Sequence, residues 1–130
     1  MSKRPNILFF GIDSLRSDHM SLYGYKRLTT PHIDRFIEDG GIVFDKMYSP
    51  SIPTTPGYAS MVTGMDCFST DCVALRHQGG LTEAVRTLPE ILRDYGYTST
   101  YIGGHSCRGC DKVITYADWN ADINFLMQCL

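Results

Sequence analysis

Apolar positions along the chain follow two patterns, one typical of buried strands and one typical of amphipathic helices. Residues 6–13 form a nearly continuous apolar run that ends in an acid, Asp13, and such runs are typical of parallel strands covered on both faces. Residues 42–48 predict a second strand. Residues 97–102 are rich in β-branched and aromatic side chains and predict a third.

Helical patterns separate these predicted strands. The first helix begins at Thr30-Pro31, because threonine caps helices and proline suits the first helical position. A short helix of about two turns is predicted over residues 57–63. A third begins with the capping box that Thr87 and Glu90 form by their spacing. Strands that alternate with helices predict an α/β layered domain built on a parallel sheet.

The remaining segments predict loops. Residues 14–30, 49–56 and 66–80 are interrupted by glycine, proline or polar residues, which break regular structure. Residues 105–130 carry no readable pattern. No internal repeat or low-complexity linker divides the chain, so a single α/β domain is expected.

Charge and length narrow the class of protein. Twelve basic residues stand against fourteen acidic ones, for a net charge of −2. This balance argues against binding to nucleic acid through phosphate neutralisation and against a polybasic membrane anchor. The longest apolar run, residues 7–12, is far shorter than the ~20 residues of a membrane helix. We therefore expect neither a nucleic-acid partner nor a membrane partner.

The amino terminus and the cysteines suggest a compartment. Residues 1–6 are basic, but the short apolar stretch after them runs directly into Asp13 without a small-residue cleavage site, so it predicts a strand and not a signal peptide. The chain has five cysteines, an odd number. Reduced thiols in the cytoplasm are the resulting expectation.

Two parts of the chain offer candidate chemistry. Asp13 ends a predicted strand, at the edge where α/β sheets bind ligands, and a buried carboxylate is costly unless it is paired or holds a metal. Asp13 either binds a metal or caps the following loop. Thr54 and Thr55 precede a predicted helix, where the positive field favours an alkoxide and an anionic substrate. The alternative role for either threonine is that of a plain helix cap.

Several segments together resemble the opening of the sulfatase family, which belongs to the alkaline-phosphatase-like superfamily. The resemblance covers roughly residues 4–104, in the family's order and at plausible spacings. It is carried by residues 5–19, Tyr23-Gly24-Tyr25, residues 30–34, the nucleophile-like segment 54–64, residues 87–92, Tyr95-Gly96-Tyr97 and Ile102-Gly103. It implies an alkaline-phosphatase-like α/β fold, here truncated.

The resemblance implies a metal-dependent hydrolase of small anionic sulfate or phosphate esters. Asp13 corresponds to a metal-binding acid, and Thr54 to the nucleophile, which also contacts the metal. The ion would be divalent: calcium, magnesium, manganese or zinc. The implied mechanism is attack on a tetrahedral anion by a metal-activated Thr54 alkoxide, followed by hydrolysis or transfer.

The nucleophile segment departs from that of sulfatases proper. They use a cysteine or serine that is oxidised to formylglycine, with proline two positions on and arginine four positions on; here the positions read Thr54, Pro56 and Tyr58. Threonine is a secondary alcohol and cannot form that aldehyde. Relatives with threonine at this position act on phosphate esters. An alternative register would begin at Ser51, with Thr55 in the place of the arginine.

A second departure concerns the ligands. Family members take further metal ligands from an Asp-His pair in a later strand, and no Asp-His dipeptide follows Thr54 in this chain. One carboxylate and one hydroxyl are too few, because catalytic metals normally have three or more protein ligands. We expect residues 1–130 to be the N-terminal portion of a sulfatase-like domain, completed by a homo-oligomer or by a missing C-terminal half. The alternative is a non-catalytic fragment or pseudoenzyme that binds a partner chain through an open sheet edge.

Other polar residues have weaker signals. Arg16 either meets an anionic substrate or pairs with Asp13 or Asp18, and pairing is favoured. His19 and His32 are expected at the surface, His105 is assigned no role, and Cys67 and Cys72 are expected to be free thiols.

The Cys107-Arg108-Gly109-Cys110 sequence has three readings. The two cysteines could bind zinc with His105 and Cys129, or form a redox pair. The third reading comes from the resemblance: family members carry a Gly-aromatic-Asp pattern near residues 109–111, which implies that Cys110 replaces a buried aromatic residue.

Overall fold

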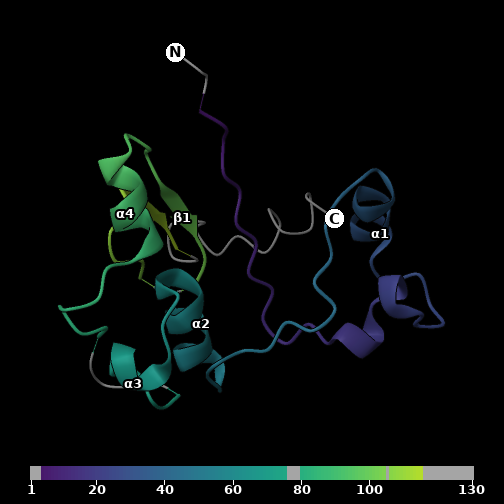
Figure 1. Ribbon diagram of the computed structural model, residues 1–130, viewed down its shortest axis with the longest axis horizontal. Helices are drawn as coiled ribbons and strands as arrows, with labels where there is room; N and C mark the ends of the chain where they lie inside the picture. Colours follow the sequence, from purple (N-terminus) through teal and green to yellow (C-terminus); the bar gives the residue numbers. More distant parts are fainter. Residues whose placement is uncertain (1–3, 76–79, 105, 116–130) are drawn as a thin grey trace. The chain divides into compact units, whose positions relative to one another are not determined.

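The computed structural model describes residues 4–75, 80–104 and 106–115. The chain divides into two compact units, Met1–Tyr48 and Ser49–Leu130. Their elements follow one another in the order shown in Figure 1: η1 (Ser17–His19), η2 (Ser21–Tyr23), α1 (Pro31–Glu38), α2 (Thr54–Thr63), α3 (Cys67–Thr70), α4 (Leu88–Asp94), β1 (Thr100–Ile102) and β2 (Lys112–Ile114).

Helix α1 organises the first unit. It begins at Pro31 directly after Thr30, as predicted, and ends at Glu38. Thr30 makes no side-chain capping bond; its hydroxyl donates to Asp34 Oδ1 at 2.8 Å, and Ser21 Oγ donates to Asp34 Oδ2 at 2.5 Å. These hydrogen bonds lower the pKa of Asp34, with Ser21 as the main cause. Asp34 thus ties η2 to α1.

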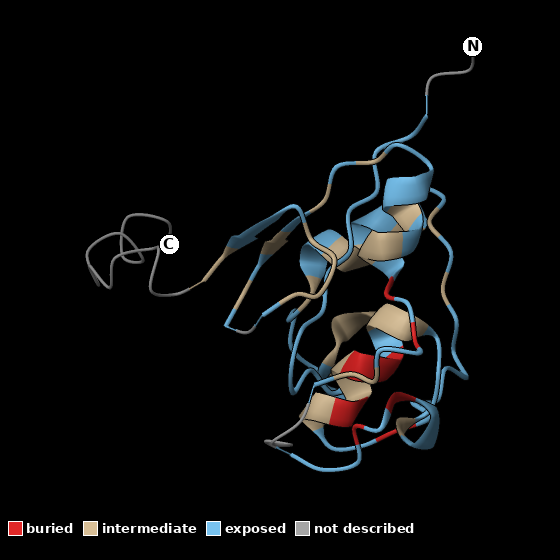
Figure 2. Ribbon diagram, turned by 90° about the vertical axis from the view of Figure 1, so that its left-hand side faces the viewer, coloured by how far each residue is buried: buried red, intermediate tan, exposed pale blue. Residues whose placement is uncertain are grey.

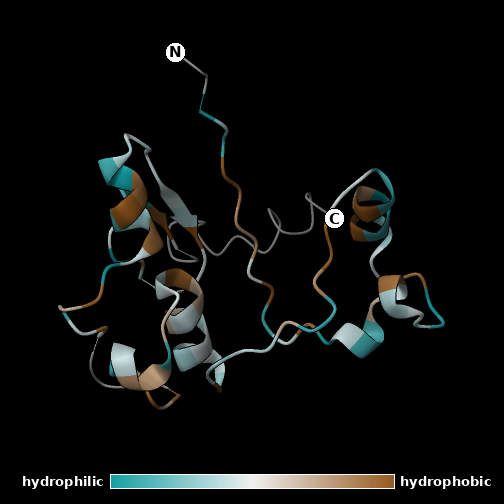
Figure 3. Ribbon diagram, viewed as in Figure 1, coloured by the Kyte–Doolittle hydropathy of each residue, from teal (hydrophilic) through white to brown (hydrophobic). Residues whose placement is uncertain are grey.

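The two strands predicted for the first unit are wrong. Residues 6–13 and 42–48 form no strand, and their large apolar side chains are exposed, including Phe10 at 78% and Phe44 at 71%. A strand needs a neighbouring backbone to accept and donate its hydrogen bonds. Among the described residues of this unit, neither segment has such a strand neighbour. Figure 3 shows the amino-terminal stretch as largely hydrophobic in colour.

The core lies in the second unit and is small. Helix α2 begins at Thr54, three residues before the predicted helix, and α3 lies inside the predicted loop 66–80. Figure 2 shows the buried residues gathering on α2 and on the segments beside it. The buried apolar residues are Pro56, Ala59, Cys72 and Val85, and the buried polar residues are Ser51, Ser60, Thr70 and Thr87. Among the described residues, buried hydroxyl groups therefore make up half of this core, and they need hydrogen-bond partners.

Helix α4 and the sheet complete the second unit. The predicted capping box is confirmed, because Thr87 and Glu90 exchange both side-chain-to-backbone hydrogen bonds. The third predicted strand is shorter than 97–102 and forms β1. It pairs with β2 in parallel, with Tyr101 opposite Val113. The parallel direction agrees with the predicted α/β class, but this sheet of two strands is too small to establish a layered domain.

Candidate active site

Asp13 lies in a turn of the first unit and not at the end of a buried strand. Its carboxylate is exposed, and Oδ1 accepts a hydrogen bond from Ser14 Oγ at 3.1 Å. Ser14 adopts a left-handed backbone conformation with φ +61°, which is uncommon for a residue other than glycine. Asp13 is exposed in this unit, so burial does not require its carboxylate to be paired or to hold a metal, and its assignment as a metal ligand rests on the family resemblance.

Arg16 pairs with Asp18, one of the two partners considered from the sequence. Its Nε and Nη2 donate to the two carboxylate oxygens at 2.9 and 2.6 Å, and His19 Nδ1 lies 3.0 Å from Asp18 Oδ1. The Arg16 hydrogen bonds are the main cause that holds the pKa of Asp18 far below its usual range, with His19 next. All three side chains are exposed, so the cluster contributes little to stability.

Thr54 is the first residue of α2, and the preceding residue, Pro53, occupies the N-cap position. The expectation that Thr54 or Thr55 caps this helix is therefore wrong: the helix begins earlier than the pattern predicted, so both threonines fall inside its first turn. Pro53 offers no side-chain capping bond. Half-buried at the helix start, Thr54 is near the positive end of the helix dipole of a ten-residue helix.

The turn before α2 is tied to the helix through hydroxyl groups. Ser49 Oγ donates to the carbonyl oxygen of Ser51 at 2.6 Å, and Ser60 Oγ on α2 donates to Ser51 Oγ at 3.1 Å. Ser51 is only 6% exposed. A nucleophile must be reached by its substrate, so this geometry favours the register that begins at Thr54 over the one that begins at Ser51.

The donor set for a metal is incomplete in the described residues. Asp13 belongs to the first unit and Thr54 to the second. Their oxygen atoms are of the type that hard divalent cations prefer. Nowhere in residues 4–75, 80–104 and 106–115 do three or more histidine, cysteine, aspartate or glutamate side chains gather as metal ligands do. The two predicted ligands fit such an ion in chemistry but not in number.

The cysteines correct one sequence expectation. Cys107 and Cys110 are joined by a disulfide, so the expectation of reduced thiols is wrong for this pair, and the two sulfurs do not form a zinc site here. Cys67 and Cys72 are free, as expected. His105 and Cys129, which the zinc reading also needed, lie outside the described residues, as does most of the uncertain tail.

Sequence reasoning did not find the polar cluster around Arg108. A cavity of about 300 Å³ beside α4 is lined by charged side chains of this cluster, among them Arg86, Glu90, Arg93 and Arg108. Arg86 pairs with Asp94 at 2.7 Å, and Arg108 Nε lies 3.4 Å from Glu90 Oε1. Arg108 and Glu90 are far apart in the sequence, so periodicity carried no signal for their contact. None of the predicted site residues lines this cavity.

Known proteins resemble the chain over most of its length. The family model described as Sulfatase matches residues 5–125. An N-acetylglucosamine-6-O-sulfatase of Bacteroides thetaiotaomicron is 34% identical over 78% of this chain and 18% of its own length. The human steryl-sulfatase is 33% identical over 82% of this chain and 20% of its own. An uncharacterized sulfatase of Escherichia coli, YidJ, is 29% identical over 95% of this chain and 25% of its own.

The chain spans about a fifth of the length of the curated relatives it matches. No solved structure is significantly similar to it. Within the described residues, no helix has both the length and the apolar character needed to cross a membrane. The family match covers more than half of the chain and includes both Asp13 and Thr54. The chain belongs to the sulfatase family.

Proposed function

We propose that this chain carries the nucleophile-bearing part of a metal-dependent hydrolase of sulfate or phosphate esters, with Thr54 as nucleophile and with Asp13 and Thr54 as metal ligands. The observation that carries the proposal is the position of Thr54 as the first residue of α2, inside the segment that the family model matches. The named relatives are sulfatases, which supports ester hydrolysis at the level of the family.

The helix start suits a reaction with an anionic ester. A helix amino terminus favours negative charge on a nearby ligand and on a developing alkoxide. The hydrogen bond from Ser60 to Ser51 fastens the preceding turn to α2, which fixes the backbone that leads to Thr54. A well-positioned nucleophile loses less freedom when it attacks.

The proposed reaction proceeds in two displacements. Thr54 Oγ1 forms a bond to sulfur or phosphorus while the bond from that atom to the alcohol oxygen breaks, and the alcohol leaves with a proton. Water then cleaves the Thr54 ester and releases inorganic sulfate or phosphate. Because threonine cannot form the formylglycine aldehyde, the nucleophile would be the hydroxyl itself, which favours a phosphate ester.

A divalent cation would supply the acidity that the hydroxyl needs, since coordination lowers the pKa of a bound oxygen. Asp13 and Thr54 would provide two ligands, and the others would come from outside the described residues, from a second copy or a further polypeptide segment. The ion would be calcium, magnesium, manganese or zinc. We propose that this reaction takes place in the cytoplasm.

Turnover and metal content of the purified chain test the proposal together. Aryl phosphate and aryl sulfate hydrolysis would be measured with each of the four cations, alongside elemental analysis. We expect Thr54→Ala to abolish turnover and Thr55→Ala, its neighbour in the same helical turn, to retain it. Asp13→Asn should lower bound metal, whereas Asp45→Asn, an exposed acid of the same unit, should not. Turnover that survives Thr54→Ala would refute the nucleophile.

A second candidate function is that of a non-catalytic chain that binds a partner polypeptide. It is favoured by the exposed apolar side chains of residues 7–12 and 42–48, which include Leu8 at 79% and Ile42 at 78%. Apolar stretches of this kind mark interaction surfaces. A purified chain without metal or turnover would favour this candidate. Light scattering should then show association that Phe10→Glu disrupts and Leu28→Glu, an exposed control outside both stretches, does not.

A further inference from the structure

The loop between β1 and β2 contains a disulfide between Cys107 and Cys110, which are spaced as a C-x-x-C motif. Both cysteines are half-buried, so solvent reaches them in part. Cysteines at this spacing have lowered thiol pKa values in many proteins and exchange readily with other thiols. Accessible disulfides are also the ones that reductants open most easily. The pair is therefore placed for reversible chemistry and not for permanent reinforcement.

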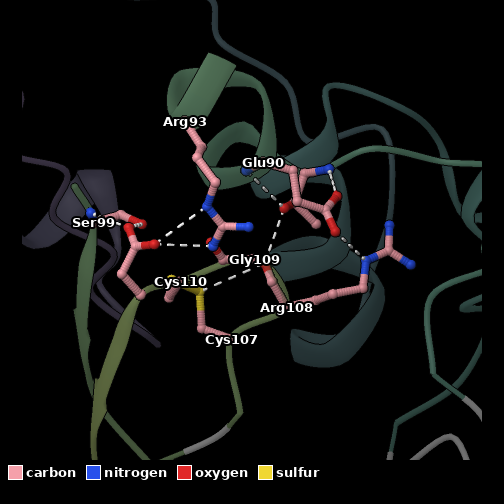
Figure 4. Close-up of a disulfide and its surroundings, with 9 residues drawn as sticks. Glu90, Arg93, Ser99, Cys107, Arg108, Gly109 and Cys110 are labelled. Carbon is pink, nitrogen blue, oxygen red and sulfur yellow. Dashed lines mark hydrogen bonds and ion pairs between the residues drawn. A yellow bond between two sulfur atoms is a disulfide. The ribbon is translucent and has the colours of Figure 1, made fainter. Parts of the chain in front are cut away.

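The disulfide closes a loop that is docked along α4, from its N-cap residue Thr87 to Arg93 near its end. Thr87 Oγ1 donates to the carbonyl oxygen of Arg108 at 2.9 Å, and Arg93 Nη2 donates to that of Gly109 at 2.7 Å. Figure 4 shows the labelled residues of this loop and of α4 directed toward each other. Two carbonyl groups between the bridged cysteines thus hold the loop against the helix.

Arg108 extends from this loop to the segment 81–85. Its Nη1 donates to the carbonyl oxygens of Leu81 and Thr82 at 3.1 and 2.9 Å, and its Nη2 donates to that of Val85. Hydrogen bonds from a charged donor are stronger than those between neutral groups. Val85 is 6% exposed and belongs to the small core. One arginine of the disulfide loop therefore holds a segment that contributes to the core.

The contacts continue from this segment toward α2. The backbone N–H of Thr82 donates to the carbonyl oxygen of Thr70 at 3.2 Å. Thr70 is fully buried at the end of α3, and α3 packs against α2. A change in the position of Arg108 would thus be transmitted to elements that pack around the helix that begins at Thr54.

We propose that Cys107 and Cys110 are a reversible redox pair whose disulfide holds Arg108 in place and thereby fixes residues 81–85. In the reduced state the loop has no covalent constraint, so Arg108 leaves its three carbonyl partners more often and the segment opens. The proposal concerns the second unit alone and does not depend on the ester chemistry.

The reductant is a dithiol, such as a protein of the thioredoxin class. One of its thiolates attacks a sulfur of the pair; a mixed disulfide forms as the Cys107–Cys110 bond breaks. The second thiol of the reductant then displaces the protein sulfur. Two electrons and two protons pass to the pair, which becomes two thiols, and the reductant leaves as a disulfide. Oxidation by a disulfide reverses these steps.

Thiol labelling and hydrogen exchange test the proposal on the full chain, with dithiothreitol as the probe. As purified, the peptide that carries Cys107 and Cys110 should take up no maleimide. After dithiothreitol in native buffer it should take up two maleimide groups, and after subsequent oxidised glutathione neither cysteine should react. Exchange at the amides of Thr82 and Val85 should become about tenfold faster on reduction, because local opening sets exchange rates. The backbone N–H of Gly64 donates to the carbonyl oxygen of Ser60 at the end of α2. Its exchange should stay slow in both states and so report that the fold is intact.

Variants separate the disulfide from the arginine. In the double variant Cys107→Ser, Cys110→Ser, the amides of Thr82 and Val85 should exchange fast with or without dithiothreitol. In Cys67→Ser they should respond to dithiothreitol as in the unaltered chain. Arg108→Met retains the disulfide and the apolar stem but removes the donors, so it should exchange fast in both redox states. Labelling of both cysteines before reduction, resistance to reduction in native buffer, or equal exchange in the two states would each overturn the proposal.

Discussion

Gly109 lies close to Thr87 and Glu90 in the disulfide loop, and Gly109→Ala tests that contact. Its φ is +86°, and an added Cβ would lie 2.9 Å from Thr87 Oγ1 and 3.1 Å from the Glu90 nitrogen, besides meeting Glu90 Cγ. The left-handed conformation alone costs a residue with a Cβ about 1–2 kcal/mol. The clash adds to this cost because two of its contacts are backbone or a buried hydroxyl, which cannot move far.

The loop can avoid the clash only by leaving α4. It would then lose the hydrogen bonds from Thr87 to Arg108 and from Arg93 to Gly109, each worth about 1 kcal/mol. We therefore expect Gly109→Ala to lower the free energy of unfolding by about 3–4 kcal/mol, the sum of the conformational cost and the two hydrogen bonds.

Gly64→Ala provides the matched control. Gly64 also has a positive φ, +72°, but an added Cβ there would have no heavy atom within 4 Å. Gly64→Ala should lower the free energy of unfolding only by the conformational cost, about 1–2 kcal/mol. Equilibrium urea unfolding of the oxidised chain, followed by circular dichroism, measures both variants. A difference between them below about 0.5 kcal/mol, which is smaller than one hydrogen bond, would refute the docking of the loop on α4.

Three further predictions concern the same unit. Thr87→Val removes a helix cap and the donor to Arg108, so it should lower the free energy of unfolding, measured in urea, by about 2 kcal/mol. Thr87→Ser keeps a hydroxyl and should retain most of the stability of the unaltered chain; equal losses in the two variants would contradict this role. The pKa of Glu90 is lowered mainly by the backbone N–H of Thr87 and further by Arg108, so its stabilising effect is full above the unfolded pKa and is lost as pH falls through the lower folded value. Urea midpoints measured below about pH 4.5 should therefore fall more steeply for the unaltered chain than for Glu90→Gln, and parallel curves would argue against this. Iodoacetamide should label Cys67 before Cys72, which is buried and whose pKa is raised by that burial; peptide mass spectrometry that finds equal rates would exclude a buried Cys72.

Features that depend on neighbouring residues were predictable from the sequence. The capping box of Thr87 and Glu90 and the start of α1 at Pro31 were both predicted and are both present. Their hydrogen bonds and backbone angles involve residues within four positions of each other, so the local sequence contains the whole signal. Family membership was also predictable, because the motifs occur in the family's order.

Strands were less predictable, because a strand is completed by a partner that lies elsewhere. Residues 6–13 have the apolar composition of a buried strand but form none in the described structure, whereas Thr100–Ile102 forms one because Lys112–Ile114 lies beside it in parallel. An apolar run indicates that a segment can be buried. Only a neighbouring backbone decides that it becomes a strand.

The candidate site divides in the same way. The sequence by itself predicted Asp13 and Thr54 as site residues, through residue type, order and the family resemblance. The tertiary structure decided that Asp13 is exposed, that Thr54 follows an N-cap proline at the start of α2, and that Ser51 is buried against Ser60. It also decided that Arg108 holds carbonyl groups more than twenty residues away. Contacts across such separations depend on how the chain folds back on itself, and no local pattern of residues contains that information.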